Sequence, residues 1–221
     1  MSSLGAFIKE VSNNSLIVDD SIDNIFNNDY KGSLIIKDTD VDLIGYIILY
    51  IAIHKELPVL GNVNHIILVT DSSDKAFNSI YNIYKDNDYL KDKITDIGYK
   101  DSLLVPSIYI EVDSYVLFIK LYDTDGYRKH TSIEGKRPNL LLVDNYCVGD
   151  CTEVNSLVNR DKLNSVKEDS YLDNIRSKSL YFNKEESNNM IFNYIKNNKN
   201  FKVVKVSNVV RFSSIVNKDS L

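Results

Sequence analysis

The sequence predicts an α/β protein with a mainly parallel central sheet, flanking helices and a β-hairpin insertion. Short apolar runs alternate with amphipathic stretches along the 221 residues, which is typical of strand–helix–strand units. Hydrophobic residues make up 43% of the chain, and a 25.3 kDa chain buries about 70% of its surface on folding. No Pro/Gly/Ser-rich linker divides the chain, so we expect a single domain over residues 1–221. Its core should span about 30–210, with 1–28 and 213–221 peripheral.

The individual elements follow from apolar periodicity and turn residues. Seven runs are expected to be strands, namely residues 33–37, 65–70, 107–112, 115–122, 139–143, 179–182 and 201–206, followed by a short apolar stretch at 209–212. Four stretches are expected to be helices, namely residues 42–54, 73–85, 154–168 and 184–196. Short oxygen-bearing side chains at 71–74 can cap the helix that starts there. Only Asp113 and Ser114 separate two of the strands, which predicts an antiparallel hairpin.

The run Leu140–Val143 is apolar at every position, as expected of a strand buried on both faces. We therefore expect it inside the sheet, with 33–37 on one side and either 65–70 or 179–182 on the other. Asp144 follows at once, and open α/β sheets bind ligands at the carboxyl ends of their strands. In a nucleotide hydrolase a carboxylate at this place holds Mg²⁺. The alternative is that Asp144 only caps the following turn.

Charge is distributed unevenly. Residues 1–125 contain 10 Lys+Arg and 20 Asp+Glu, whereas residues 126–221 contain 16 and 11. A basic second half is compatible with a nucleic-acid partner, because phosphate attraction is the sequence-independent part of such binding. Solvated lysines on helix faces would give the same count.

Other compositional features point to the cytosol. The two cysteines, Cys147 and Cys151, cannot form a disulfide framework. No apolar stretch reaches the ~18 to 20 residues of a membrane span, and the first residues lack a basic region ahead of an apolar core. We therefore expect a cytoplasmic protein with no secretory signal and no membrane partner.

One segment carries a family resemblance. The string GYRKHTSIEGKRPNLLLVDN, residues 126–145, resembles the ATPase domain of tailed-phage large terminase subunits, which drive DNA into the procapsid. There an Arg-containing loop and a G-x-R-P-D-L run lead into the Walker B strand; here the counterparts are Arg128, Gly135, Arg137, Pro138 and Asp144. Weaker similarity extends over about 30–210. The resemblance implies a P-loop-NTPase-like fold of the terminase ATPase type and a bacteriophage or prophage origin.

The departures from that family concern its chemistry. A phosphate-binding loop needs glycines, which let backbone amides approach the phosphates, and a lysine for the β and γ charges. The corresponding segment, Lys37-Asp38-Thr39-Asp40-Val41-Asp42, has no Gly-Lys-Ser/Thr. The position of the catalytic carboxylate after Asp144 is Asn145, whose amide cannot accept a proton from water. The family's nuclease domain would lie beyond Leu221.

These departures predict a degenerate terminase-like ATPase fold, a pseudoenzyme of DNA packaging with ATP hydrolysis lost or weak. One alternative is a non-enzymatic virion or phage interaction module. Another is an active Mg-ATP hydrolase with an atypical loop, in which Lys37 and Thr39 bind nucleotide and Asp144 holds Mg²⁺, since some packaging ATPases place the lysine early in the motif.

The expected partners are DNA and phage packaging or virion proteins, with self-association open, in the host cytoplasm or in the virion. Four cations lie close together in one short segment, and they are the expected DNA contacts: Arg128, Lys129, Lys136 and Arg137. The alternative for Arg137 is an ion pair with Asp144 or a neighbouring carboxylate that braces the turn into the strand, while Lys129 and Lys136 remain solvated.

Overall fold

The computed structural model describes thirteen stretches of the chain, namely residues 3–18, 20–23, 26, 33–37, 43–57, 61–70, 72–101, 106–113, 115–123, 139–144, 178–183, 201–205 and 210–211. The helical elements are α1 (Leu4–Val11), the 3-10 turn η1 (Asp20–Asp23), α3 (Leu43–His54), α4 (Ser73–Lys85) and α5 (Asp88–Lys93). The strands are β1 (Leu16–Ile17), β2 (Ser33–Lys37), β3 (Glu56–Leu57), β4 (Gly61–Asn62), β5 (Ile66–Thr70), β6 (Asp96–Lys100), β7 (Ser107–Val112), β8 (Tyr115–Asp123), β9 (Leu140–Val143), β10 (Lys178–Asn183), β11 (Phe201–Lys205) and β12 (Val210–Arg211).

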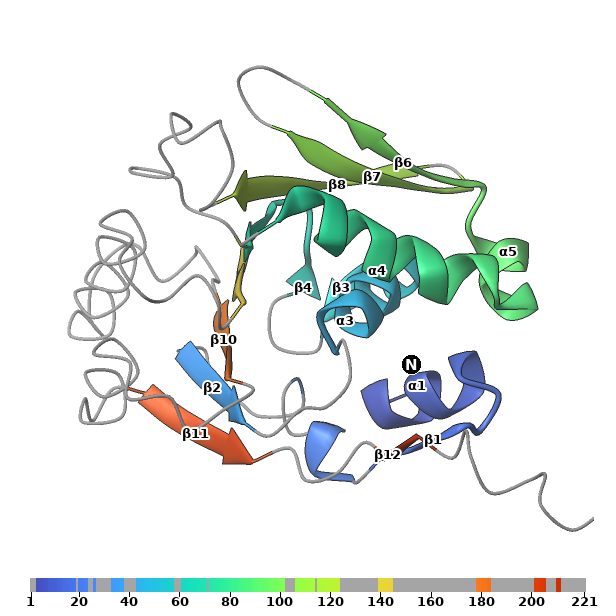
Figure 1. The fold of residues 1–221 in the computed structure, drawn as a ribbon. Helices are drawn as coiled ribbons and strands as arrows, with labels where there is room; N and C mark the ends of the chain where they lie inside the picture. The colour runs from blue at the N-terminus through green and yellow to red at the C-terminus, as the bar shows by residue number, and fades with distance from the viewer. Residues whose placement is uncertain are drawn as a thin grey trace, which may run out of the picture.

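An eight-stranded sheet organises the molecule, in the order β11-β2-β10-β9-β5-β8-β7-β6 (Figure 1). The pairings from β11 to β8 are parallel, whereas β8-β7 and β7-β6 are antiparallel. The sheet is therefore mixed, and the α/β class is confirmed. The predicted hairpin is confirmed as well, since β7 and β8 pair around Asp113.

The strand β9 lies inside the sheet as predicted, but one of its expected neighbours is wrong. Its neighbours are β5 and β10, and β2 lies one strand further away, beyond β10. The interior position agrees with burial on both faces. Leu140 and Leu142 belong to the main core cluster, and Leu141 on the opposite face is 1% exposed. Pairing order differs from the expectation because it depends on how far each crossover travels, which the residue pattern of a strand does not encode.

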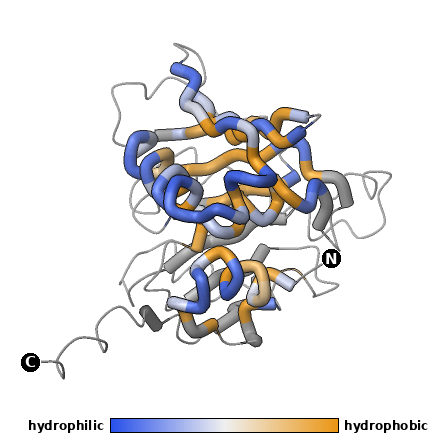
Figure 2. The backbone as a smooth tube through the Cα atoms, turned by 90° about the vertical axis from the view of Figure 1, so that its right-hand side faces the viewer, coloured by the Kyte–Doolittle hydropathy of each residue, from blue (hydrophilic) through white to orange (hydrophobic). Residues whose placement is uncertain are grey.

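The helix α3 is buried on every side. All residues from Leu43 to Ala52 are buried, because α3 packs against α4, α1 and β7. A helix that is hydrophobic all round needs such an enclosed position. Figure 2 shows hydrophobic segments running through the middle of the upper part of the molecule, with hydrophilic segments toward its outside.

The sequence-based expectation lacks the helices α1 and α5 and the edge strand β6, as well as the 3-10 turn η1 and the two-residue strands β1, β3 and β4. The helix α1 starts at the N-cap Ser3, and it places Leu4, Phe7, Ile8 and Val11 in the same core cluster as α3. The first residues of the chain thus contribute to the core, although the sequence analysis set 1–28 apart as peripheral. The short helix α5 and the edge strand β6 complete the antiparallel end of the sheet. The helices expected at 154–168 and 184–196 lie outside the described residues.

Candidate functional site

The carboxyl ends of the parallel strands lie along one edge of the sheet. In the registers, Lys37 of β2 is paired with Asn183 of β10 and with Lys205 of β11. Val143 of β9 lies between Tyr181 of β10 and Val69 of β5, so Asp144 comes one residue closer to this edge. Open α/β sheets bind ligands at such an edge. The structure therefore brings Lys37 and Asp144, two of the predicted site residues, to the same edge.

One strand separates these two residues. Because β10 lies between β2 and β9, the backbones at Lys37 and Asp144 are two strand spacings apart, or about 10 Å. The space between the two strands is filled by β10, so a ligand that contacts both residues would lie over the end of β10, at Asn183.

Backbone hydrogen bonds fix the position of Asp144. Its backbone N–H donates to the carbonyl of Val69 at 3.0 Å, which continues the β5–β9 pairing by one residue. At the other end of the strand, the Asn139 side-chain oxygen accepts from the His65 N–H at 3.2 Å, and the Asn139 N–H donates to the His65 carbonyl at 2.9 Å. Both ends of β9 are thus tied to β5. The Asp144 side chain is half-buried.

The end of β5 is a second polar point on this edge, which the sequence analysis did not propose. Thr70 is 3% exposed, and its hydroxyl accepts from the Ser72 N–H and donates to the Ser72 carbonyl, both at 3.3 Å. Ser72 in turn caps α4 by accepting from the Lys75 N–H at 3.3 Å, which confirms the predicted helix start. Register places Asp123, the last residue of β8, beside Thr70. The sequence could have indicated Thr70 and Asp123 as candidates, because each is a polar residue at the end of a largely apolar strand.

The remaining predicted site residues lie outside the described residues. These are Thr39, Asn145, Arg128, Lys129, Lys136 and Arg137, together with Asp38, Asp40 and Asp42 of the segment after Lys37. Their roles stay predictions. Within the part of the chain that the structure describes, no group of three His, Cys, Asp or Glu side chains could hold a metal ion. No helix in that part is long and apolar enough to cross a membrane.

Comparisons with known proteins give a fold and no closer relationship. No protein-family model matches the chain, and no curated protein matches it. Among solved structures, the chain is similar to a large terminase from a thermophilic bacteriophage, with a TM-score of 0.50 and 12% sequence identity. The match covers 86% of this chain and 46% of the terminase, so the chain spans about half the length of that protein. At this identity the likeness shows a terminase-like fold.

Proposed function

We propose that this chain is a degenerate terminase-like ATPase fold of a phage or prophage, which acts as an accessory in viral DNA packaging with ATP hydrolysis lost or weak. The observation that carries the proposal is the edge of the sheet, where Asp144 follows the interior strand β9 and Lys37 ends a strand two places away. The terminase-like fold supports it. We assign the chain to the P-loop-NTPase-like class on the same grounds.

The loss of hydrolysis is argued from the residues available to hold Mg-ATP. After Lys37 the chain continues with Asp-Thr-Asp-Val-Asp, so three carboxylates (Asp38, Asp40 and Asp42) and no glycine occupy the place of the phosphate-binding loop. Like charges oppose anion binding there, even at a favourable helix N-terminus. Asn145 cannot act as a general base. These residues do not fit Mg-ATP, and we derive no catalytic step through it.

The active-ATPase alternative relies on the position of Lys37. This lysine is the last residue of β2, in the row of Asn183, at the edge where the phosphates of a nucleotide would lie. Among the described residues at this edge, it is the cation placed to replace the missing motif lysine near Asp144, because Lys205 lies on the far side of β2. This alternative predicts nucleotide binding that depends on Lys37, and calorimetric titration with Mg-ATP tests it.

The accessory role requires contact with DNA, which we assign to Arg128, Lys129, Lys136 and Arg137. Four cations lie within ten residues there, offset only by Glu134. In the sequence this segment precedes β9, the strand that leads into Asp144. Phosphate contacts release counterions, so four of them predict a slope of log K against log salt of about −3.6 on duplex DNA, at about −0.9 per contact.

The experiment compares DNA binding of the wild type with that of the triple variant Arg128→Ala/Lys129→Ala/Lys136→Ala over a salt series. We expect the variant to bind more weakly. Its slope of log K against log salt should become less negative by about 3, because three contacts are removed. Arg137 is left unchanged, so that an ion pair of Arg137 with a neighbouring carboxylate would survive. Lys85→Ala on the exposed surface of α4 is the matched control and should leave the slope unchanged. Undiminished binding by the triple variant, or no binding by the wild type at low salt, would contradict the DNA role and favour the interaction module.

A further inference from the structure

The antiparallel end of the sheet has one face that no described element covers. Figure 1 shows α4 along one side of β6, β7 and β8, with none of the described helices on the opposite side. Side chains alternate accordingly. Ile97, Ile108, Ile110, Leu117 and Ile119 point to the core, whereas Val116 and Phe118 on the opposite face are 41% and 44% exposed. We call this opposite face of the three strands the outer face.

Registers divide the outer face into three rows that cross the strands. One row is basic at both ends and consists of Lys100, Ser107 and Lys120. The middle row is apolar and consists of Gly98, Tyr109 and Phe118. The third row, Asp96, Glu111 and Val116, is acidic on β6 and β7. Since same-face residues are two apart, the basic and acidic rows lie about 13 Å apart on either side of the apolar row.

The middle row is a flat aromatic surface. The Tyr109 ring lies across Gly98, where an added Cβ would come within 2.3 Å of the ring atoms, and its hydroxyl donates to Asp96 at 2.9 Å. The ring is thereby held down on the edge strand, a role that aromatic residues play over strand glycines. Phe118 continues the row on β8. Phe118 and Val116, both on β8, are the most exposed apolar side chains of the outer face, at 44% and 41%.

We propose that the outer face binds a second copy of this chain in a weak, symmetric dimer, with the two-fold axis along the Gly98–Tyr109–Phe118 row. Rotation about that axis places the apolar row on its own copy and the basic row over the acidic row of the other copy. Lys100 then faces Asp96 of the second chain. Two-fold interfaces are self-complementary in this way.

Charge favours this axis over a two-fold axis that runs along the strands. An axis along the strands would set the basic row against the basic row and the acidic row against the acidic row, and like charges across an interface are strongly unfavourable. An arbitrary apolar partner would not need opposite charges at equal distances from the aromatic row. The polarised pattern therefore favours a second copy as the occupant.

The size of the outer face limits the strength of the dimer. Stable interfaces contain about 20–30 residues on each side, and this face has nine. We therefore expect a dissociation constant weaker than about 1 µM, with association visible only at higher concentrations.

Sedimentation velocity of the full chain over a concentration series tests the dimer. The weight-average sedimentation coefficient should rise with concentration for the wild type, and Phe118→Ala should abolish the rise. Tyr81→Ala is the matched control, since Tyr81 is an aromatic side chain on α4, 39% exposed, on the opposite side of the sheet. A wild type that stays monomeric at all concentrations, or a Phe118→Ala variant that associates as the wild type does, would overturn the proposal.

Charge reversal tests the axis. Lys100→Glu alone and Asp96→Lys alone should each weaken self-association by about tenfold, because each brings like charges together twice per dimer. A 1:1 mixture of the two variants should associate more strongly than either alone, because in the mixed dimer the reversed charges at positions 100 and 96 meet each other with opposite signs. Lys85→Glu, the same charge change on α4, should have no effect. A mixture that associates no better than the single variants would refute the axis.

Discussion

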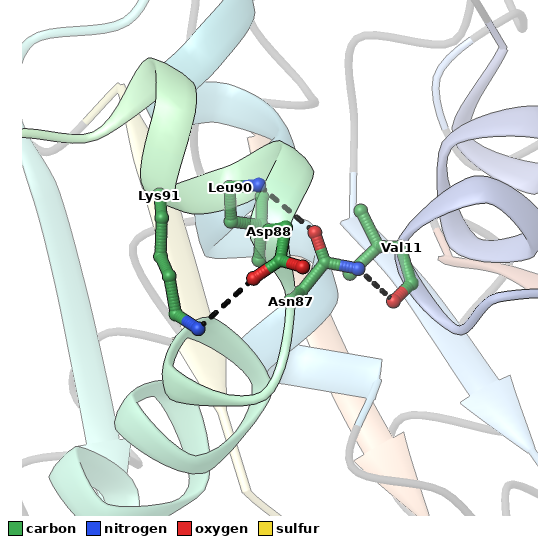
Figure 3. Close-up of polar contacts among 5 residues, drawn as sticks. All are labelled: Val11, Asn87, Asp88, Leu90 and Lys91. Carbon is green, nitrogen blue, oxygen red and sulfur yellow. Dashed lines mark hydrogen bonds and ion pairs between the residues drawn. The ribbon is translucent and has the colours of Figure 1, made fainter.

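A buried amide, Asn87, joins the N-terminal helix to the turn between α4 and α5. Its side-chain oxygen accepts from the Leu90 N–H at 2.8 Å and caps α5, while its side-chain nitrogen donates to the carbonyl of Val11 at the end of α1 (Figure 3). The residue is 3% exposed, so neither contact can be replaced readily by water. The neighbouring pair Asp88 and Lys91, at 3.2 Å, is exposed and contributes little.

Replacement of Asn87 by alanine should therefore be costly. We expect Asn87→Ala to lower the free energy of unfolding by about 2–4 kcal/mol, because the helix cap is lost and the Val11 carbonyl is left buried without its donor. Asn78→Ala, on the exposed surface of α4, is the matched control and should change stability by less than about 0.5 kcal/mol. Urea denaturation measures both. Equal effects of the two substitutions would contradict the role of Asn87.

His54 makes stability depend on pH. It lies at the end of α3, with its ring 4.5 Å from the Tyr50 ring and 6.3 Å from the Phe7 ring, centroid to centroid. Burial lowers the pKa of His54 below its usual 6.5, and the positive N-terminus lowers it further. The helix C-terminus would favour the charged imidazolium, but burial outweighs it.

The sign of the pH effect follows from the lowered pKa. The folded state binds the proton more weakly than the unfolded state, so stability is complete above about pH 6.5 and falls as the pH drops toward the folded-state pKa. We expect the wild type to lose more stability between pH 7.5 and 5.5 than His54→Gln, measured by urea denaturation at each pH. If His54→Gln lost as much stability as the wild type over this pH range, or more, His54 would not be the responsible group.

At the scale of elements, the expectations succeeded where a long apolar pattern coincided with clear turn residues. The bounds of β2, β7 and α4 agree with the sequence-based ranges. The strand β6 was missed because it contains Gly98 and lies at the sheet edge, where only Ile97 and Tyr99 face the core. The helix α1 carried a usable signal, since Leu4, Phe7, Ile8 and Val11 recur at helical spacing after Ser3.

The importance of α1 can be measured directly. Phe7 is fully buried and contacts the Tyr50 ring edge-on at 5.5 Å, so Phe7→Ala should destabilise the protein by about 3–5 kcal/mol through the cavity it leaves. Phe118→Ala deletes the same side chain from an exposed position and should cost less than about 1 kcal/mol at concentrations where the chain is monomeric. Thermal or urea unfolding compares the two. If Phe7→Ala lowered the free energy of unfolding by as little as Phe118→Ala does, α1 would not contribute to the core.

At the scale of the whole molecule, the position of Asp144 in the sheet could be predicted from the sequence, whereas its distance from Lys37 could not. Asp144 was predicted correctly at the end of an interior strand, because a strand apolar on both faces and a following carboxylate are both visible in the sequence. The separation of Lys37 from Asp144 by β10 was not predictable. It arises from residues 178–183 entering the sheet between strands that precede them in the chain.

The central claim is that a terminase-like fold persists here without effective nucleotide binding. The segment after Lys37 lacks the glycines and the lysine of a phosphate-binding loop. Without them at least two charge-assisted hydrogen bonds of about 1.5–3 kcal/mol each are missing, which should weaken binding on the order of 10² to 10⁴-fold. Calorimetric titration of the full chain with Mg-ATP tests this most directly. We predict no saturable heat at micromolar nucleotide, in the wild type and in Lys37→Ala alike. A micromolar dissociation constant that Lys37→Ala or Asp144→Asn abolishes would contradict the account and establish the active-ATPase alternative.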